Sequence, residues 1–275
     1  MTAIRSRWAV FARRGAGTLL AMVFAAYAAV SLWVYFKQES LIFRPVPLAL
    51  DHRFPFDNIR EVSIPVAGAL LSAVHLKFND PKGVVFFLHG NSGNLKSWLT
   101  NTEFYRHANY DLFMIDYRGF GKSTGQIDGE EQLHTDVRAA WDTIAAEYKG
   151  KKIVVYGRSL GTGLAAKLAS DIQPDLTVLV SPYESLKALG DRAYPWLPAF
   201  INRYTMRTDR WLPEIKNAVV IEHGDRDTLI PIAHAQALMR ARPTSELIVV
   251  ENAGHNDIHK FQKYLDTLTA RLTNL

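Results

Sequence analysis

The sequence predicts an α/β fold in which a mostly parallel central sheet is flanked by helices and preceded by one membrane-spanning helix. Strand-like apolar runs alternate with amphipathic helical patterns from residue 59 to the C-terminus, and such alternation is typical of a parallel sheet with helices on both faces. A strand, a tight glycine turn and a helix succeed one another around Ser159. An uncharged apolar stretch covers residues 15–36.

Residues 1–40 are predicted to form a basic N-terminus followed by a transmembrane anchor. The uncharged stretch 15–36 is long enough to cross a bilayer as a helix. Four arginines and no acidic residue precede it: Arg5, Arg7, Arg13 and Arg14. The positive-inside rule then leaves the N-terminus in the cytoplasm and sends the rest of a single-pass chain to the far, periplasmic or extracytoplasmic, side. The alternatives are a cleaved signal peptide, whose apolar part is usually about 7–15 residues, and a buried helix.

The composition excludes several functions. The formal net charge is +5, and the four N-terminal arginines account for most of it, so the remainder is near neutral and nucleic acid is not an expected partner. The chain has no cysteine, which rules out disulfides and thiolate metal sites. The glycine-containing run at residues 119–125 lacks the spacing of a dinucleotide or phosphate-binding loop. We therefore expect neither a metal nor a cofactor.

Residues 41–275 are predicted to form one domain, a length that a single α/β core can fill. Residues 59–77 resemble two antiparallel strands around a turn at Gly68. The following strands are expected at residues 84–88, 112–115, 152–156, 176–180, 218–222 and 247–250. Helices are expected from residue 164 and at residues 130–148, 233–242 and 260–272.

Residues 183–217 interrupt this alternation. The segment is too long for an ordinary connection between two elements, and it is rich in aromatic residues: Tyr183, Tyr194, Trp196, Phe200, Tyr204 and Trp211. One interpretation is a small helical lid over Ser159 that binds acyl chains. The other is a surface excursion packed against the edge of the sheet.

The sequence around Ser159 is Gly157-Arg158-Ser159-Leu160-Gly161. A Gly-x-Ser-x-Gly between a strand and a helix is typical of a nucleophile elbow, in which the serine occupies a sharp turn and its neighbours must lack side chains. Ser159 is therefore the candidate nucleophile.

A nucleophilic serine needs a histidine base and an acid that orients the base. His255 follows both a glycine and the strand at residues 247–250, which makes it the preferred base among nine histidines. Two acids follow the strand at residues 218–222, Asp225 and Asp227. Asp227 is favoured, because Asp225 directly after a glycine is well placed for a local Asx-turn. His89 and His223, each before a glycine at a strand end, are expected to hydrogen-bond the loop backbone.

The chain resembles serine hydrolases of the α/β-hydrolase superfamily, and more narrowly the membrane-anchored abhydrolase-domain branch that includes depalmitoylase-like proteins and related bacterial proteins. The likeness spans about residues 41–275 and is carried by residues 89–94, 116–123, 157–161, 223–227 with Pro231, and the Gly-His-Asn run around His255. In that family the acid stands three residues after the glycine of the His-Gly pair, which is Asp227. The resemblance also implies an oxyanion hole formed by the backbone N–H groups of Asn91 and Leu160.

The predicted function is hydrolysis of a carboxylic ester or thioester through an acyl-enzyme. An amidase or peptidase with the same triad is one alternative. A non-catalytic, membrane-tethered binding module on a hydrolase scaffold is another. The expected partners are a small acyl substrate and, through the N-terminal helix, the membrane.

Overall fold

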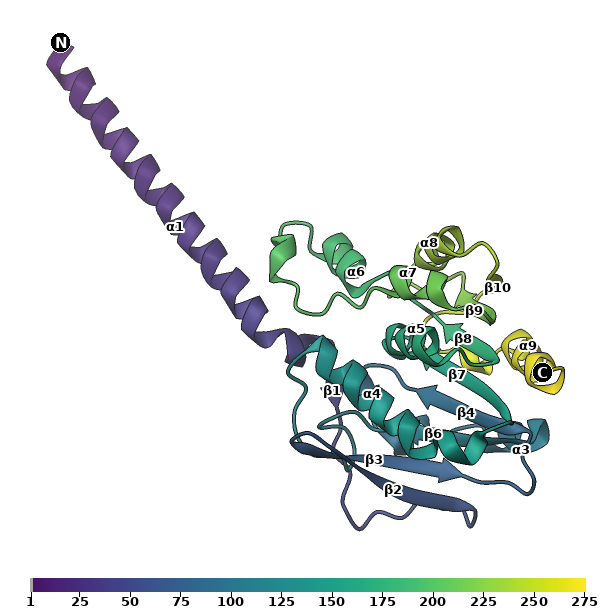
Figure 1. Cartoon of the computed structure of the whole chain (residues 1–275). Coiled ribbons are helices and arrows are strands. Elements are labelled where there is room, and N and C mark those ends of the chain that lie inside the picture. The colour runs from purple at the N-terminus through teal and green to yellow at the C-terminus, as the bar shows by residue number, and fades with distance from the viewer. Residues whose placement is uncertain (1) are drawn as a thin grey trace.

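The computed structural model describes the backbone of residues 2–275 and the side chains of residues 15–275. An eight-stranded sheet forms its centre (Figure 1). The spatial order of the strands is β10 (Glu246–Val250), β9 (Ala218–Gly224), β8 (Leu176–Val180), β7 (Lys152–Arg158), β4 (Gly83–Leu88), β6 (Tyr110–Ile115), β3 (Ala69–Leu76) and β2 (Ile59–Val66).

The sheet is parallel except at one edge. From β10 to β6 every neighbouring pair runs in the same direction. At the other edge β3 pairs antiparallel with both β6 and β2, and the β2–β3 hairpin places Ile59 opposite Leu76. The predicted antiparallel pair and the predicted mostly parallel sheet are both confirmed.

Helices cover both faces of the sheet. One face carries α4 (Glu130–Ala145), α5 (Gly161–Ile172), α7 (Thr208–Trp211) and α8 (Ala233–Ala241). The opposite face carries α3 (Thr102–Ala108) and α9 (Gln262–Thr273). Two short 3-10 turns, η1 (Ala146–Tyr148) and η4 (Ile258–Lys260), adjoin α4 and α9.

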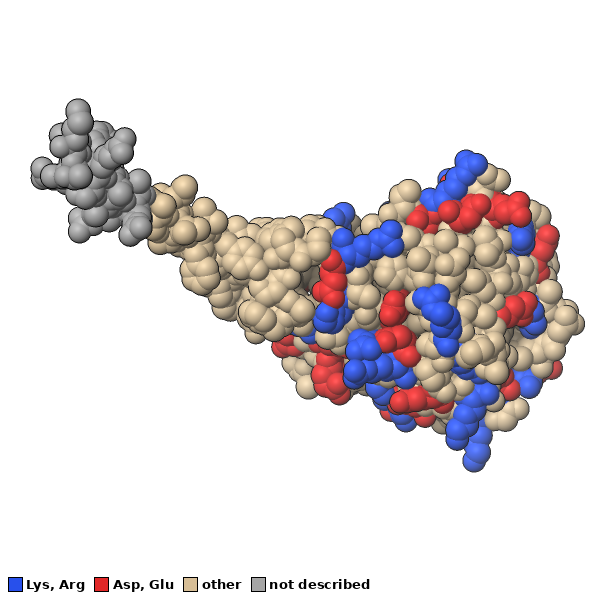
Figure 2. Space-filling model, turned by 90° about the horizontal axis from the view of Figure 1, so that it is seen from above, with Lys and Arg blue, Asp and Glu red and all other residues tan. Residues whose placement is uncertain are grey.

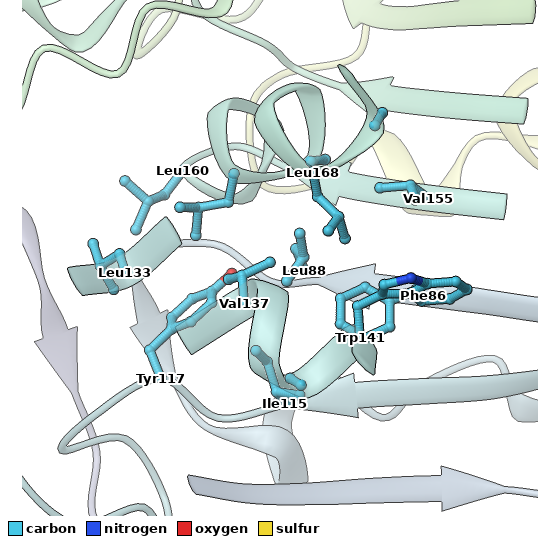
Figure 3. Close-up of a cluster of buried hydrophobic side chains, with 14 of the residues drawn as sticks. Phe86, Leu88, Ile115, Tyr117, Leu133, Val137, Trp141, Val155, Leu160 and Leu168 are labelled. Carbon is cyan, nitrogen blue, oxygen red and sulfur yellow. The ribbon is translucent and has the colours of Figure 1, made fainter. Parts of the chain in front are cut away.

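The core has two halves, one on each side of the sheet. All of β4 is buried, and its side chains alternate: Phe86 and Leu88 join the half under α4 and α5, whereas Phe87 joins the half under α9. Figure 3 shows Phe86 close to Trp141 of α4, and Leu168 of α5 facing the same layer. Burial on both faces explains why the sequence presents continuous apolar runs here rather than an alternating pattern.

The run after β6 has a structural role. Arg118 forms a buried ion pair with Asp136 of α4, with 2.6 Å between Nε and Oδ2. The Tyr117 hydroxyl donates to the carbonyl of His89 at 2.9 Å. This run therefore supports the loop that follows β4.

A short strap ties the N-terminal helix to the same loop. After α1 (Thr2–Ile42), the two-residue strand β1 (Arg44–Pro45) pairs with β5 (Ser92–Gly93), just before α2 (Leu95–Trp98). The Arg44 amide donates to the carbonyl of Asn91 at 2.7 Å. The end of α1 is thus joined to residues next to the candidate site.

Helix α1 projects away from the domain (Figure 1). Its part Gly15–Ile42 is long enough and apolar enough to cross a membrane. The predicted orientation rests on Arg5, Arg7, Arg13 and Arg14, which lie outside the residues whose side chains the structure describes.

The insert at residues 183–217 is folded into short helices, and some of its aromatic side chains are buried while others are exposed. It contains α6 (Leu186–Ala193), η2 (Ala199–Ile201), α7 and η3 (Leu212–Glu214). Tyr183 and Tyr204 are fully buried in the core, whereas Tyr194, Trp196 and Phe200 are exposed. The exposed aromatic side chains of the insert therefore lie in its middle, which reaches toward α1 in Figure 1, whereas Trp211 of α7 is half-buried.

Candidate active site

Ser159 lies on a strained turn between β7 and α5. Its φ is +52°, in the left-handed region that side chains other than glycine rarely adopt, at a cost on the order of 1–3 kcal/mol. A Cβ at Gly157 would approach the carbonyl oxygen of Gly161 to 2.6 Å, and one at Gly161 would approach that of Leu88 to 2.1 Å. Both flanking positions therefore require glycine, because β7 nearly touches the start of α5 at Gly157 and the start of α5 nearly touches the end of β4 at Gly161.

Three side chains predicted from the sequence lie in one hydrogen-bonded series. Nε2 of His255 is 2.9 Å from Oγ of Ser159, and Nδ1 of His255 is 2.7 Å from Oδ2 of Asp227. An ionised carboxylate can only accept, so Nδ1 carries the proton and donates to Asp227. Nε2 is then left to accept the hydrogen bond from the Ser159 hydroxyl, the arrangement in which an imidazole can remove the serine proton.

Asp227 is held ionised by its loop. Burial opposes its charge, but hydrogen bonds from His255 and from the Ile230 amide outweigh burial and place the pKa of Asp227 below its ordinary value. Oδ1 accepts from the amides of Leu229 at 3.0 Å and Ile230 at 2.8 Å. Asp225 is exposed. The Asx-turn that the sequence suggested for Asp225 is therefore made by Asp227, which binds the loop with one oxygen and His255 with the other.

Two further histidines hold loop backbone, as expected. Nδ1 of His89 is 2.7 Å from the carbonyl oxygen of Gly90, and Nε2 of His223 is 2.7 Å from that of Ile230. The predicted roles of His89 and His223 in the loops are confirmed.

The two residues predicted to form the oxyanion hole are anchored through their carbonyl groups. The Asn91 carbonyl accepts from Arg44, and the Leu160 carbonyl accepts from the buried Tyr183 hydroxyl at 2.9 Å. In the part of the chain that the structure describes, neither residue's amide donates to another backbone carbonyl. A Cβ added to Gly90 would lie 3.6 Å from that of Ser159, so the loop before Asn91 rests against the candidate nucleophile.

Arg158 is a positioning residue that sequence reasoning missed. Its side chain is buried, and Nη2 donates to the carbonyl of His255 at 2.6 Å. The residue before the candidate nucleophile Ser159 therefore holds the loop that carries the candidate base His255. A variable position within Gly-x-Ser-x-Gly gives no signal of this role, although a charged residue at the end of a buried strand is itself unusual.

The carboxyl group of Glu222 lies near enough to this arginine to interact with its charge. It stands one residue before His223, is fully buried, and neither carboxylate oxygen has a hydrogen-bond partner among the described residues. Burial raises the pKa of Glu222 to about 8, although the nearby positive charge of Arg158 acts in the opposite direction. The carboxyl is therefore protonated at neutral pH.

A cavity of about 400 Å³ opens beside the site. It is bordered by Gly93 of the loop after β4, by Arg158 and by Asn256, and it continues between Trp98 and Tyr264. Arg158 and Asn256 are the chain neighbours of Ser159 and His255, and Gly93 lies in the same loop as Asn91. This position gives a substrate room on the α9 side of the site.

One group of possible metal ligands lies elsewhere among the described residues. His75, Asp111 and Glu147 place ligand atoms within 4.8 Å of one another. The Tyr148 hydroxyl already lies 2.6 Å from Nε2 of His75 and donates to Asp111. Burial and two nearby cations lower the pKa of His75 to about 4. This group is a hydrogen-bonded network between β3, β6 and η1, remote from Ser159.

The sheet order, the elbow and the Ser-His-Asp series define an α/β-hydrolase fold. The family described as serine aminopeptidase, S33, matches residues 79–211. The alpha/beta hydrolase domain-containing protein 17B of Xenopus tropicalis is 32% identical over 208 residues, which cover 70% of this chain and 69% of that protein. The chain belongs to the α/β-hydrolase family, in the abhydrolase-domain branch that the sequence predicted.

Two other comparisons agree on this fold. The alpha/beta hydrolase domain-containing protein aho-3 of Caenorhabditis elegans is 33% identical over 191 residues, which cover 67% of this chain and 55% of that protein. The chain thus spans only 55% of the length of aho-3. An esterase of Pyrococcus furiosus has the same fold, with a TM-score of 0.66 and 24% identity over 84% of this chain and 99% of its own.

The protonated Glu222 makes stability depend on pH in a defined direction. Its pKa is about 8 in the folded chain against an ordinary 4.5. Between these values the unfolded chain releases a proton that the folded chain retains, so the free energy of unfolding falls as pH rises, by up to about 1.4 kcal/mol per pH unit. Glu222→Gln removes this loss. We expect its melting temperature to exceed that of the natural protein by a margin that grows from pH 4.5 to pH 8.

Thermal unfolding followed by circular dichroism at several pH values measures this margin. The matched control is Glu251→Gln, which changes an exposed carboxylate and should add no pH-dependent margin. If the margin for Glu222→Gln did not change with pH, Glu222 would be ionised and paired with Arg158 instead.

Proposed function

We propose that this protein is a serine hydrolase that cleaves carboxylic ester or thioester bonds, with Ser159 as nucleophile, His255 as base and Asp227 as the acid that orients the base. The observation that carries the proposal is the continuous hydrogen-bonded series from Ser159 through His255 to Asp227. Membership of a hydrolase family and a likeness to an esterase structure support it.

The geometry suits a two-step acyl transfer. His255 takes the proton of Ser159 through Nε2 as Oγ attacks the acyl carbonyl carbon, and the imidazolium is stabilised by the ionised Asp227. The oxygen that becomes negative accepts hydrogen bonds from the amides of Asn91 and Leu160. His255 then returns the proton to the leaving alcohol or thiol. A water molecule repeats the sequence on the acyl-enzyme and releases the acid.

We infer a membrane setting for this chemistry. Residues 1–40 would anchor the chain, and the hydrolase domain, residues 41–275, would lie on the far side from the basic N-terminus. An apolar acyl group held by the membrane is then a suitable substrate, and the insert at residues 183–217 would act as a lid over it. The apolar helix Gly15–Ile42 supports this setting.

Cleavage of an amide is the second candidate. It is favoured by the description of the matching family as a serine aminopeptidase, and the same three side chains can cleave amides. Turnover of p-nitrophenyl acyl esters compared with aminoacyl anilides separates the two: an esterase turns over the esters far faster.

The proposed roles predict a sharp contrast between two neighbouring aspartates. Asp227→Asn should lower kcat by about 10⁴-fold, because an amide favours the wrong tautomer of His255. Ser159→Ala and His255→Ala should each be at least as damaging, since the three residues act as a unit. Asp225→Asn is the control, an exposed position two residues away, and should keep most of the activity. The measurement is steady-state hydrolysis of a p-nitrophenyl ester by the purified full-length protein.

Circular dichroism must show that each variant is folded. A Ser159→Ala protein that kept more than about a tenth of the activity would contradict the mechanism. Loss of activity in Asp225→Asn but not in Asp227→Asn would mean that the acid is misassigned.

The membrane setting predicts a preference for longer acyl chains. Burial of each CH₂ contributes about 0.8 kcal/mol, or roughly fourfold in binding. We therefore expect kcat/KM for p-nitrophenyl esters to rise with acyl length until the acyl pocket is full. A series from acetyl to decanoyl, measured below the micelle concentration of each ester, tests this, and acetyl esters as good as octanoyl would contradict it.

A further inference from the structure

The exposed middle of the insert touches α1 inside the apolar part of that helix. The Tyr27 hydroxyl donates to the carbonyl of Trp196 at 2.9 Å. The two rings also meet edge to face, with 6.5 Å between their centroids. Residues 169 positions apart in the chain are thus joined at a level where α1 carries no charge.

A second set of contacts lies nearer the C-terminal end of α1, where its sequence becomes polar. Gln38 donates to the carbonyl of Ile201 at 2.6 Å and accepts from the amide of Arg203 at 2.9 Å. Arg203 also pairs with Glu39 at 2.7 Å. The polar and charged contacts thus gather at Gln38 and Glu39, and the aromatic contact of Tyr27 lies about three turns nearer the N-terminus of α1.

The spacing of these contacts sets a depth. Tyr27 lies nine residues before Phe36, the last residue of the uncharged stretch, which corresponds to about 13 Å of helix. The hydrocarbon core of a bilayer is about 30 Å thick. If residues 15–36 span that core, Trp196 lies within the leaflet next to the domain and not beyond its surface.

The insert tip, residues 193–202, has the composition of a membrane-embedded segment. It contains no charged residue, although Arg192 and Arg203 flank it directly. Phe200 is 86% exposed, Tyr194 55% and Trp196 52%. Such a cluster of large exposed apolar side chains marks an interaction surface. Figure 2 likewise shows the charged side chains over the domain. The described part of α1 that projects from the domain, residues 15–36, carries none.

The backbone of the tip is also suited to an apolar medium, where an unpaired polar group costs several kcal/mol (on the order of 2–7). Pro195 and Pro198 have no N–H to satisfy. The amides of Leu197 and Ile201 donate to carbonyls within the tip. The carbonyls of Trp196 and Ile201 accept from α1 side chains.

A cavity of about 600 Å³ between the tip and α1 points to the same surroundings. It is bordered by ten residues, and Ser31 is the one that carries an aliphatic hydroxyl among them. The remainder of its border is Phe24, Tyr27, Ala28, Leu32, Tyr35, Phe36, Pro198, Phe200 and Ile201. Water would find few partners in such a cavity, whereas lipid acyl chains would fill it.

We propose that the insert tip, residues 193–202, is a second membrane-embedded element that lies in the domain-side leaflet against α1. The bilayer is the partner of Tyr194, Trp196 and Phe200, and Arg192 and Arg203 stand at its surface. This proposal rests on the membrane anchor of the proposed function. It adds that the domain is held to the bilayer at two points, which fixes its orientation and brings the insert, rather than the β2–β3 edge, to the lipid.

The absence of cysteine from the chain permits a direct test with single-cysteine variants of the full-length protein. Phe200→Cys carries a nitroxide at the tip. Leu20→Cys, 70% exposed on α1, is the control for the anchor, and Leu70→Cys, 44% exposed in the β2–β3 hairpin, is the control for the aqueous domain. The proteins are reconstituted in phosphatidylcholine vesicles, and electron paramagnetic resonance measures the collision of each label with oxygen and with a water-soluble nickel chelate.

We expect the labels at Leu20 and Phe200 to collide at least several-fold more with oxygen than with the chelate, and the label at Leu70 to do the reverse. An embedded Leu20 label with a water-exposed Phe200 label would overturn the insert proposal and leave the anchor intact. A water-exposed Leu20 label would overturn the anchor, and the insert proposal with it. The ester hydrolysis of each labelled protein reports separately on the proposed chemistry.

Discussion

The close approach of β7 and α5 at Ser159 is the constraint on which the rest of the site depends. A Cβ at Gly157 would fall 2.6 Å from the carbonyl oxygen of Gly161 across the turn, and one at Gly161 would fall 2.1 Å from the carbonyl oxygen of Leu88 at the end of β4. Without this close approach, Ser159 could relax from its strained φ of +52°. Its hydroxyl would then no longer face the sheet edge. At that edge the loops after β9 and β10 bring Asp227 and His255 to it. Free energy gained by burying β7 and α5 in the core offsets the local strain.

Much of this arrangement follows from local sequence signals. Ser159, Asp227 and His255 each stand on a loop just past the end of a strand, and parallel strands bring their carboxyl ends to the same edge. The hairpin 59–77, the alternation of strands and helices and the elbow were therefore predictable. Contacts between distant segments were not. The hydrogen bond from Arg158 to His255 joins residues 97 positions apart, and no periodicity signals it.

The insert is a second case in which the sequence leaves the packing undetermined. Its aromatic composition is visible in the sequence, but which rings are buried depends on packing. Tyr183 fills the space beside Gly163 and holds the Leu160 carbonyl, whereas Phe200 is exposed.

The strap from α1 to Asn91 passes through Arg44. Helix α1, the insert and the loop of Asn91 are thus physically connected, so the proposed seat of the domain on a bilayer would be coupled to the geometry around Ser159.

The central claim is that His255 activates Ser159 as a nucleophile. Reaction of the detergent-solubilised, full-length protein with a fluorophosphonate, followed by intact mass and peptide mapping, tests it most directly. The account predicts one adduct per chain, located on Ser159 and lost in His255→Ala. A folded protein that formed no adduct, or that formed it on another serine, would contradict the account.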